Sequence, residues 1–213
     1  MTQTNRAIIV PLFCGLCFLL HLFSSPFLRL PFPIGAEDFF IADLLQTTFP
    51  LRVDTLHEGH LWTVLSYALV HGNWWHLLFN LFGLWITGRT LEQILGWKRI
   101  SALFLLGCLA GAVGFLISLI LDPRLAPSTT CIGASAILTA SIGTITTTFA
   151  QQPVTLWIGF IPIRLKAILL LPLLLICFII ECALPSLGTA YGAHLGGWLA
   201  GLFFGLAIRK DCV

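Results

Sequence analysis

The chain has 213 residues, of which 58% are hydrophobic and only 9% are charged. Soluble domains carry about 25% charged residues, so this composition, with a mean hydropathy of +0.97, indicates an integral membrane protein and excludes an ordinary soluble one. The formal net charge of +2 is too small to suggest binding to nucleic acid.

Six apolar segments follow one another along the chain, and each approaches the about 20 residues that a helix needs to cross a bilayer. They predict an all-α polytopic membrane protein with six transmembrane helices, in a single domain over residues 1–213. The first segment could be mistaken for a signal peptide, but it lacks a clear small-x-small cleavage site, so we count it as a span. The expected spans are 7–23, 74–91, 100–121, 135–150, 165–184 and 191–208.

The segment between the first two spans, about 24–73, is not a typical soluble linker. It mixes Phe, Leu and Pro with a few acidic residues. Such a composition favours a loop that lies in the membrane interface, half among the lipid headgroups.

The expected orientation follows from the placement of Lys and Arg, which concentrate on the cytoplasmic side of membrane proteins. With the N-terminus inside, the outer side holds only Arg29, Arg52 and Arg124, together with most of the acids. Both termini are therefore expected in the cytoplasm. The basic residues expected on the cytoplasmic side are Arg6, Arg89, Lys98, Arg99, Arg164, Lys166, Arg209 and Lys210.

The fourth span is short for a membrane helix. Residues 135–150 rise about 24 Å at ~1.5 Å per residue, whereas the hydrocarbon core is about 30 Å thick. The Gln-Gln-Pro that follows fixes its inner end, so its outer end should begin below the outer surface. The preceding segment, 126–133, must then enter the membrane as non-helical backbone, which requires burial in protein or a water-filled cavity. Ser135 is therefore expected at a helix N-terminus, at the floor of a wet pocket that opens outward.

Three more polar residues are expected at a similar depth on the same side. His194 lies about one turn inside the outer end of the sixth span. His76 and Asn80 lie in the outer half of the second span, four residues apart and hence on one helix face. Ionisable residues inside spans are costly and usually functional.

These residue types fit acyl transfer. A serine hydroxyl becomes a nucleophile when a neutral histidine takes its proton, which suggests Ser135 and His194. The developing oxyanion needs hydrogen-bond donors, which Asn80, His76 and the Ser135 amide can supply, while Gly133 leaves room for close approach. The only acid within a span is Glu181, and nothing in the sequence aims it at His194, so the pattern favours a Ser–His dyad.

Each residue also has a reading without chemistry. Ser135 alone fits a helix N-cap or a small packing residue, and His194 and Asn80 alone fit hydrogen-bonded residues at helix contacts. The coincidence of all four polar residues at one depth favours catalysis. Small residues at four-residue steps predict close packing of the fourth and sixth spans, which would bring Ser135 to His194: Ala136, Ala140, Gly192, Gly196, Gly197, Gly201 and Gly205.

Metal and soluble-hydrolase sites do not fit. The HEGH stretch, His57 to His60, has the wrong spacing for the HExxH zinc motif, so no metal or other cofactor is expected. Ser135 is not in a GxSxG elbow, because Ile137 occupies the final glycine position.

At these residues the sequence resembles the rhomboid family of intramembrane serine proteases. The second span resembles the family's HxxxxHxxxN helix followed by GxxxExxxG, GASA at 133–136 resembles its GxSG motif, and AHLGG at 193–197 resembles its AHxxG helix. The resemblance implies Ser135 as nucleophile, His194 as base, and His76, Asn80 and the Ser135 amide as the oxyanion site. It also implies a compact, six-span bacterial type in the inner membrane that cleaves transmembrane segments of protein substrates near their outer ends.

Three positions depart from the family pattern. Ala136 replaces the second glycine of GxSG, a minimal change that should preserve activity. Thr139 occupies a position that often holds an aromatic residue packed on the catalytic histidine, so the orientation of His194 is less constrained. Thr63 follows Trp62 where a Trp-Arg pair is common, which concerns the anchoring of the long loop.

Two other functions fit the composition. A non-catalytic relative that binds membrane-protein clients is the first, although the intact Ser and His argue against it. A small transporter is the second, but there is no inverted repeat and the polar cluster is shallow, whereas transporters bind near the midplane. The sequence leaves the natural substrate and the oligomeric state open.

Overall fold

The computed structural model describes residues 6–24, 31–32, 39–126, 128–158, 161–184 and 190–211, and within them the chain is mostly helical. Four α-helices have more than 14 residues: α1 (Ile9–Ser24), α5 (Trp74–Leu95), α6 (Trp97–Leu121) and α9 (Tyr191–Ile208). The shorter elements are β1 (Pro31–Phe32), β2 (Phe39–Phe40), α2 (Ile41–Thr48), α3 (Val53–His57), α4 (Thr63–Ser66), η1 (Tyr67–Leu69), α7 (Ser135–Thr148), β3 (Pro153–Ile158), β4 (Ile161–Lys166), η2 (Ala167–Leu169), α8 (Leu170–Ala183) and η4 (Arg209–Asp211).

Each of the six expected spans coincides with one helix, and the bounds differ by a few residues. Two helices, Trp97–Leu121 and Tyr191–Ile208, are long and apolar enough to cross a membrane by themselves. The apolar helices Ile9–Ser24 and Ala167–Ala183 are shorter, and α7 has only 14 residues. The structure therefore supports a helical membrane fold, while the number of spans stays a prediction.

The expectation of an all-α chain is wrong in detail, because strands β3 and β4 form an antiparallel hairpin between α7 and α8. Pro153 pairs with Lys166 at one end and Ile158 with Ile161 at the other. β-Branched residues such as Val154, Thr155 and Ile163 favour extended backbone, and this preference outweighs the helical expectation near residue 165.

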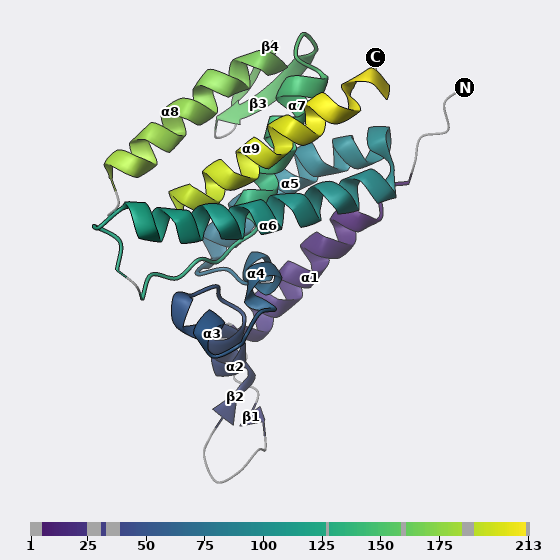
Figure 1. Ribbon diagram of the computed structural model, residues 1–213. Helices are drawn as coiled ribbons and strands as arrows, with labels where there is room; N and C mark the ends of the chain where they lie inside the picture. Colours follow the sequence, from purple (N-terminus) through teal and green to yellow (C-terminus); the bar gives the residue numbers. More distant parts are fainter. Residues whose placement is uncertain are drawn as a thin grey trace.

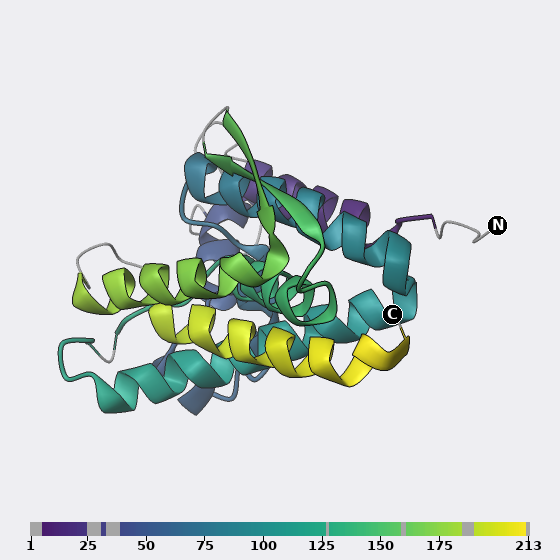
Figure 2. The ribbon, with the colours of Figure 1, turned by 90° about the horizontal axis from the view of Figure 1, so that it is seen from above.

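Helix α9 lies between α6 and α8 in both ribbon views, and α7 lies behind α9 in the view of Figure 1 (Figures 1 and 2). α7 packs against α5, α6, α8 and α9 and carries nine buried residues. It is thus the central helix of the bundle, and its 14 residues agree with the expectation of a short fourth span. α1 begins and α9 ends at the same, right-hand end of both views.

Small residues let α7 and α9 approach closely, which confirms the predicted packing. A Cβ atom on Gly197 would collide with the carbonyl oxygen of Ala136, and one on Gly201 with that of Ala140. A Cβ atom on Gly205 would collide with the Thr147 hydroxyl and would lie 2.8 Å from the carbonyl oxygen of Thr144. Since only glycine fits at these contacts, the backbones themselves touch, as is typical of small-residue contacts between membrane helices.

Glutamate 92 joins α5 to the start of α1. Its carboxylate accepts hydrogen bonds from the backbone N–H groups of Ile8 and Ile9 at 2.7 Å each, and of Val10 at 2.9 Å. These are among the N–H groups that a helix leaves unpaired at its N-terminus, and a carboxylate there is favourable. Gly88 and Glu92 of the GxxxExxxG motif lie inside α5, and Gly96, with φ +82°, forms the turn into α6.

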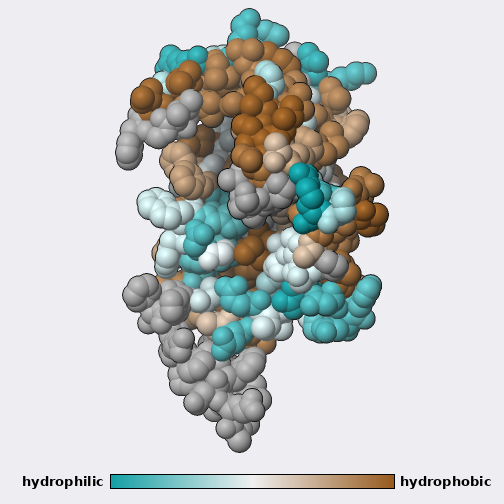
Figure 3. Space-filling view, turned by 90° about the vertical axis from the view of Figure 1, so that its left-hand side faces the viewer, coloured by the Kyte–Doolittle hydropathy of each residue, from teal (hydrophilic) through white to brown (hydrophobic). Residues whose placement is uncertain are grey.

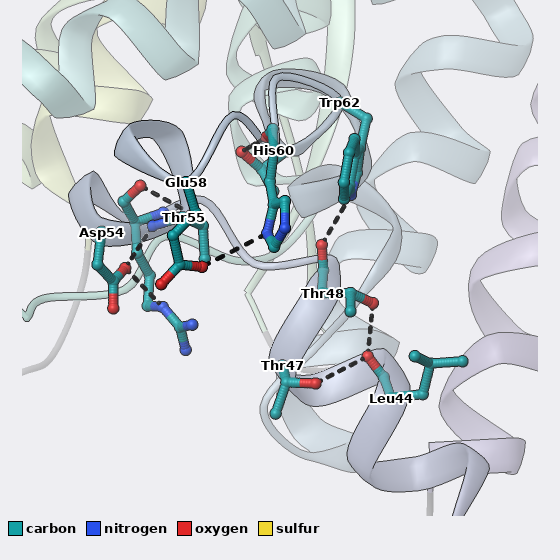
Figure 4. A network of polar contacts seen from close by, with 10 residues as sticks. Leu44, Thr47, Thr48, Asp54, Thr55, Glu58, His60 and Trp62 are labelled. Carbon is teal, nitrogen blue, oxygen red and sulfur yellow. Dashed lines mark hydrogen bonds and ion pairs between the residues drawn. The ribbon is translucent and has the colours of Figure 1, made fainter. Parts of the chain in front are cut away.

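In its described residues, the expected interfacial loop contains the short strands β1 and β2, the short helices α2, α3 and α4, and η1. Residues 25–30 and 33–38 lie outside the described part of the chain. Trp62 donates its indole N–H to the Thr48 carbonyl at 2.9 Å and stacks on His60 (Figure 4). Thr63 is fully buried and donates its hydroxyl to the His60 carbonyl at 2.7 Å. Thr63 is therefore packed inside this segment, and its hydroxyl is satisfied locally.

The outer surface of the helices is strongly apolar. Large side chains on every long helix are exposed, including Leu12, Phe79, Ile120, Ile179 and Phe203. On the face in Figure 3, hydrophobic residues gather over the upper part, and hydrophilic residues extend across the lower part. Soluble monomers rarely expose apolar surface on this scale, so lipid is its natural environment.

Replacement of Glu92 by Gln should destabilise the fold. Gln keeps one acceptor oxygen and loses the charge, so part of the three-bond cap is lost, at a cost of about 2–3 kcal/mol. Thermal unfolding in detergent should show a lower Tm for E92Q, whereas Gln93→Ala, on the exposed side of α5, should leave it unchanged. Equal Tm values for E92Q and wild type would contradict this role.

Candidate active site

The segment before α7 is non-helical and tightly held, as the length of the fourth span predicts. Leu51 and Cys131 exchange two backbone hydrogen bonds of 3.1 and 2.9 Å, and the Gly133 N–H donates to the Tyr67 carbonyl at 2.8 Å. The Ala134 N–H donates to Nε2 of His71 at 3.3 Å. Burial lowers the pKa of His71 to about 3, so its ring is neutral and its free nitrogen can accept this bond. Ser135 thus begins α7 at a fixed position.

Ser135 and His194 lie side by side. The Ser135 Oγ is 2.8 Å from Nε2 of His194, which is the fourth residue of α9. The Thr139 hydroxyl, one turn further along α7, donates to the His194 carbonyl at 3.0 Å. The packing of α7 on α9 therefore produces the hydroxyl–imidazole contact that a serine nucleophile needs.

Two side chains of α5, His76 and Asn80, face Gly133, which lies two residues before Ser135. A Cβ atom on Gly133 would lie 2.5 Å from Nε2 of His76 and 3.3 Å from Nδ2 of Asn80. Asn80 is buried, and its Nδ2 has no hydrogen-bond partner in the described part of the chain. Buried donors are normally paired, so an unpaired N–H at this position is suited to a ligand oxygen. The backbone at Gly133 has φ +104°, which glycine adopts readily.

The structure also brings Glu181 to His194, which the sequence does not predict. Its two carboxylate oxygens lie 2.8 and 3.0 Å from Nδ1 of His194. The expectation of a dyad without a third member is therefore wrong as a description of the geometry. The only signal in the sequence is that Glu181 is the sole acid inside a predicted span, a feature that by itself marks a functional candidate.

The predicted site side chains thus come together from three helices, and a fourth helix contributes a residue that was not predicted. α7 provides Ser135, α9 provides His194, α5 provides His76 and Asn80, and α8 adds Glu181. The His57–His60 stretch belongs to the segment between α1 and α5, where His60 stacks on Trp62 (Figure 4). Among the described residues, no group of three or more metal-ligating side chains lies together.

Known proteins with similar sequences identify the family of this chain. A family model described as the rhomboid domain matches residues 58–211. The chain is 29% identical over 153 residues to RHOMBOID-like protein 5 of Arabidopsis thaliana, which covers 72% of this chain and 46% of that protein. It is 28% identical over 155 residues to the mitochondrial Rhomboid protein 1 of Saccharomyces cerevisiae. That alignment covers 70% of this chain and 42% of the yeast protein.

A third relative has a different description. The Inactive rhomboid-related protein 2 of Caenorhabditis elegans is 27% identical over 180 residues, with 80% of this chain and 47% of that protein covered. The chain therefore spans about half the length of the curated relatives it matches, and these include a protein named as inactive.

Replacement of Gly133 by Ala should destabilise the site through two effects. A side chain at positive φ costs about 1–3 kcal/mol, and its Cβ would also displace His76. Gly59→Ala separates the backbone strain from the clash with His76. Gly59 also has positive φ (+86°), but a Cβ atom there would have no neighbour within 4 Å. Thermal unfolding should give a clearly lower Tm for G133A than for G59A, and equal values would contradict the close contact with His76.

Proposed function

The chain belongs to the rhomboid domain family of membrane proteins, and on that basis we propose that it is an intramembrane serine endopeptidase. The observation that carries the proposal is the 2.8 Å contact between the Ser135 hydroxyl and Nε2 of His194. Its substrates are membrane proteins, cut in a transmembrane segment near the outer end. No cofactor takes part in the reaction.

The reaction begins with acylation of the enzyme. The Ser135 Oγ attacks the scissile carbonyl carbon, and its proton passes to Nε2 of His194. The carbonyl electron pair moves onto oxygen, where N–H donors of Asn80, His76 and the Ser135 backbone stabilise the charge. Nε2 then gives its proton to the departing amine nitrogen as the carbon–nitrogen bond breaks. The unpaired Asn80 Nδ2 beside Gly133 supports its assignment as a donor.

The same two side chains then hydrolyse the acyl-enzyme, with water in the place of the departed amine. Water enters from the outer side, gives a proton to His194 and attacks the ester carbon. The Ser135 oxygen leaves and regains its proton from His194. The position of Ser135 at the N-terminus of the short helix α7, below non-helical backbone, supports water access from that side.

The proposed topology is one domain over residues 1–213 with six spans, in which α1, α5, α6, α7, α8 and α9 cross or enter the membrane. Both termini face the cytoplasm, and the site opens to the opposite side. The distribution of Lys and Arg supports this orientation. The proposed location is a bacterial inner membrane.

A second candidate function is a non-catalytic role in binding membrane-protein clients. The relative named as inactive is the observation that favours it. The intact Ser135–His194 contact favours the protease instead, because a binding protein has no need to keep the hydroxyl at hydrogen-bond distance from the imidazole.

Reconstitution with a model transmembrane substrate tests the proposal. Wild type should release a defined product, whereas Ser135→Ala and His194→Ala should release none. Asn80→Ala should still cleave the substrate, but with a kcat about 10²–10³-fold below wild type, the usual effect of losing one oxyanion donor. Ser128→Ala removes an exposed hydroxyl from the loop before α7 and should match wild type. Equal product from wild type and S135A would exclude the protease and leave the client-binding function.

A further inference from the structure

The side chain of Glu181 lies on the far side of the His194 ring from Ser135. Its carboxylate oxygens are 2.8 and 3.0 Å from Nδ1, while Nε2 is 2.8 Å from the Ser135 Oγ. Both ring nitrogens of His194 are thus occupied, one by α8 and the other by α7. This is the order of groups in a carboxylate–histidine–serine chain.

Glu181 and His194 meet in a mostly enclosed, apolar environment. The His194 and Glu181 side chains are only 21% and 19% exposed. They line a small cavity of about 70 Å³ whose other walls are mostly apolar: Thr139, Leu174, Cys177, Phe178, Leu195 and Trp198. A carboxylate among apolar side chains is costly unless it is paired, and His194 is its one hydrogen-bond partner in the described part of the chain.

Helix α8 is held at this position by a few polar contacts rather than by burial. Leu170 is its only buried residue among those described. At its other end, Arg124 donates to the Cys182 carbonyl at 2.9 Å and to the Asp122 carboxylate at 2.7 Å. Asp122 also accepts from the Tyr191 hydroxyl at 2.6 Å. The residue after Glu181 is thus tied to the end of α6 and the start of α9, which places the carboxylate against His194.

We propose that Glu181 is a positioning residue of the protease, so that the site works as a Ser135–His194–Glu181 triad; this role rests on the function proposed above. A carboxylate only accepts hydrogen bonds, so it selects the tautomer with the proton on Nδ1 and leaves Nε2 free to take the Ser135 proton. When Nε2 receives that proton, the ring becomes a cation next to the carboxylate.

The charge and the geometry of Glu181 can be separated by substitution. Gln has the same shape and keeps an acceptor for the Nδ1 proton, but it carries no charge. Asp keeps the charge and is one methylene shorter. A merely structural hydrogen bond would therefore survive in E181Q, whereas stabilisation of the imidazolium would not. Ile180→Ala is the matched control, because Ile180 is the preceding residue of α8 and is 47% exposed.

The test uses the full chain reconstituted in liposomes with a model transmembrane substrate, and it measures kcat, KM and Tm for each variant. E181Q should lower kcat by about 10²–10⁴-fold, with KM and Tm near the wild-type values, because substrate does not touch Glu181. E181D should recover part of the loss, and I180A should match wild type.

The other outcomes overturn the proposal in distinguishable ways. If wild type cleaves, S135A does not, and E181Q keeps kcat within about threefold of wild type, Glu181 has no positioning role although the protein is a protease. If E181Q and E181D lose activity only in proportion to a lower Tm, the residue is structural. If wild type gives no more product than S135A, the proposed function fails and the role of Glu181 fails with it.

Discussion

The close contact between α7 and α9 is the constraint on which the rest of the structure depends. Gly197 and Gly201 bring the backbone of α9 against the carbonyl groups of Ala136 and Ala140, with no space for a Cβ atom. At this separation the first turn of α7 and the first turn of α9 lie together, and Ser135 meets His194. The contact between the two side chains thus follows from how closely the two helices pack.

The remaining elements support this pair from three directions. Non-helical backbone from Cys131 to Ala134 is held by Leu51, Tyr67 and His71, so α7 begins at a fixed height. Helix α5 brings His76 and Asn80 against Gly133. Helix α8 reaches the opposite side of His194 through Glu181. Each contact joins elements far apart in sequence, so the site exists only in the assembled helix bundle.

Much of this arrangement could be predicted from the sequence, because depth in a membrane can be read from residue position. The short fourth span predicts that Ser135 begins a helix, and the ends of the second and sixth spans predict the depth of His76, Asn80 and His194. The rotation of a helix about its axis is harder to read. α9 has a stripe of glycines that shows which side it buries, whereas α8 is apolar all round, so nothing indicates that Glu181 turns toward His194. The hairpin of β3 and β4 was also not predicted, because an apolar run near a span end reads equally well as helix or strand.

Labelling of Ser135 by a fluorophosphonate probe tests most directly whether the packing of α7 on α9 activates it. In the wild-type protein the account predicts that mass spectrometry finds the label on Ser135. In Gly201→Val, which adds bulk at Ala140 and about two turns from His194, the rate of labelling should fall at least about tenfold, because the two helices are forced apart. Ala207→Val adds bulk to the exposed side of the same helix and should be labelled like wild type. Labelling of folded Gly201→Val at the wild-type rate would contradict the account.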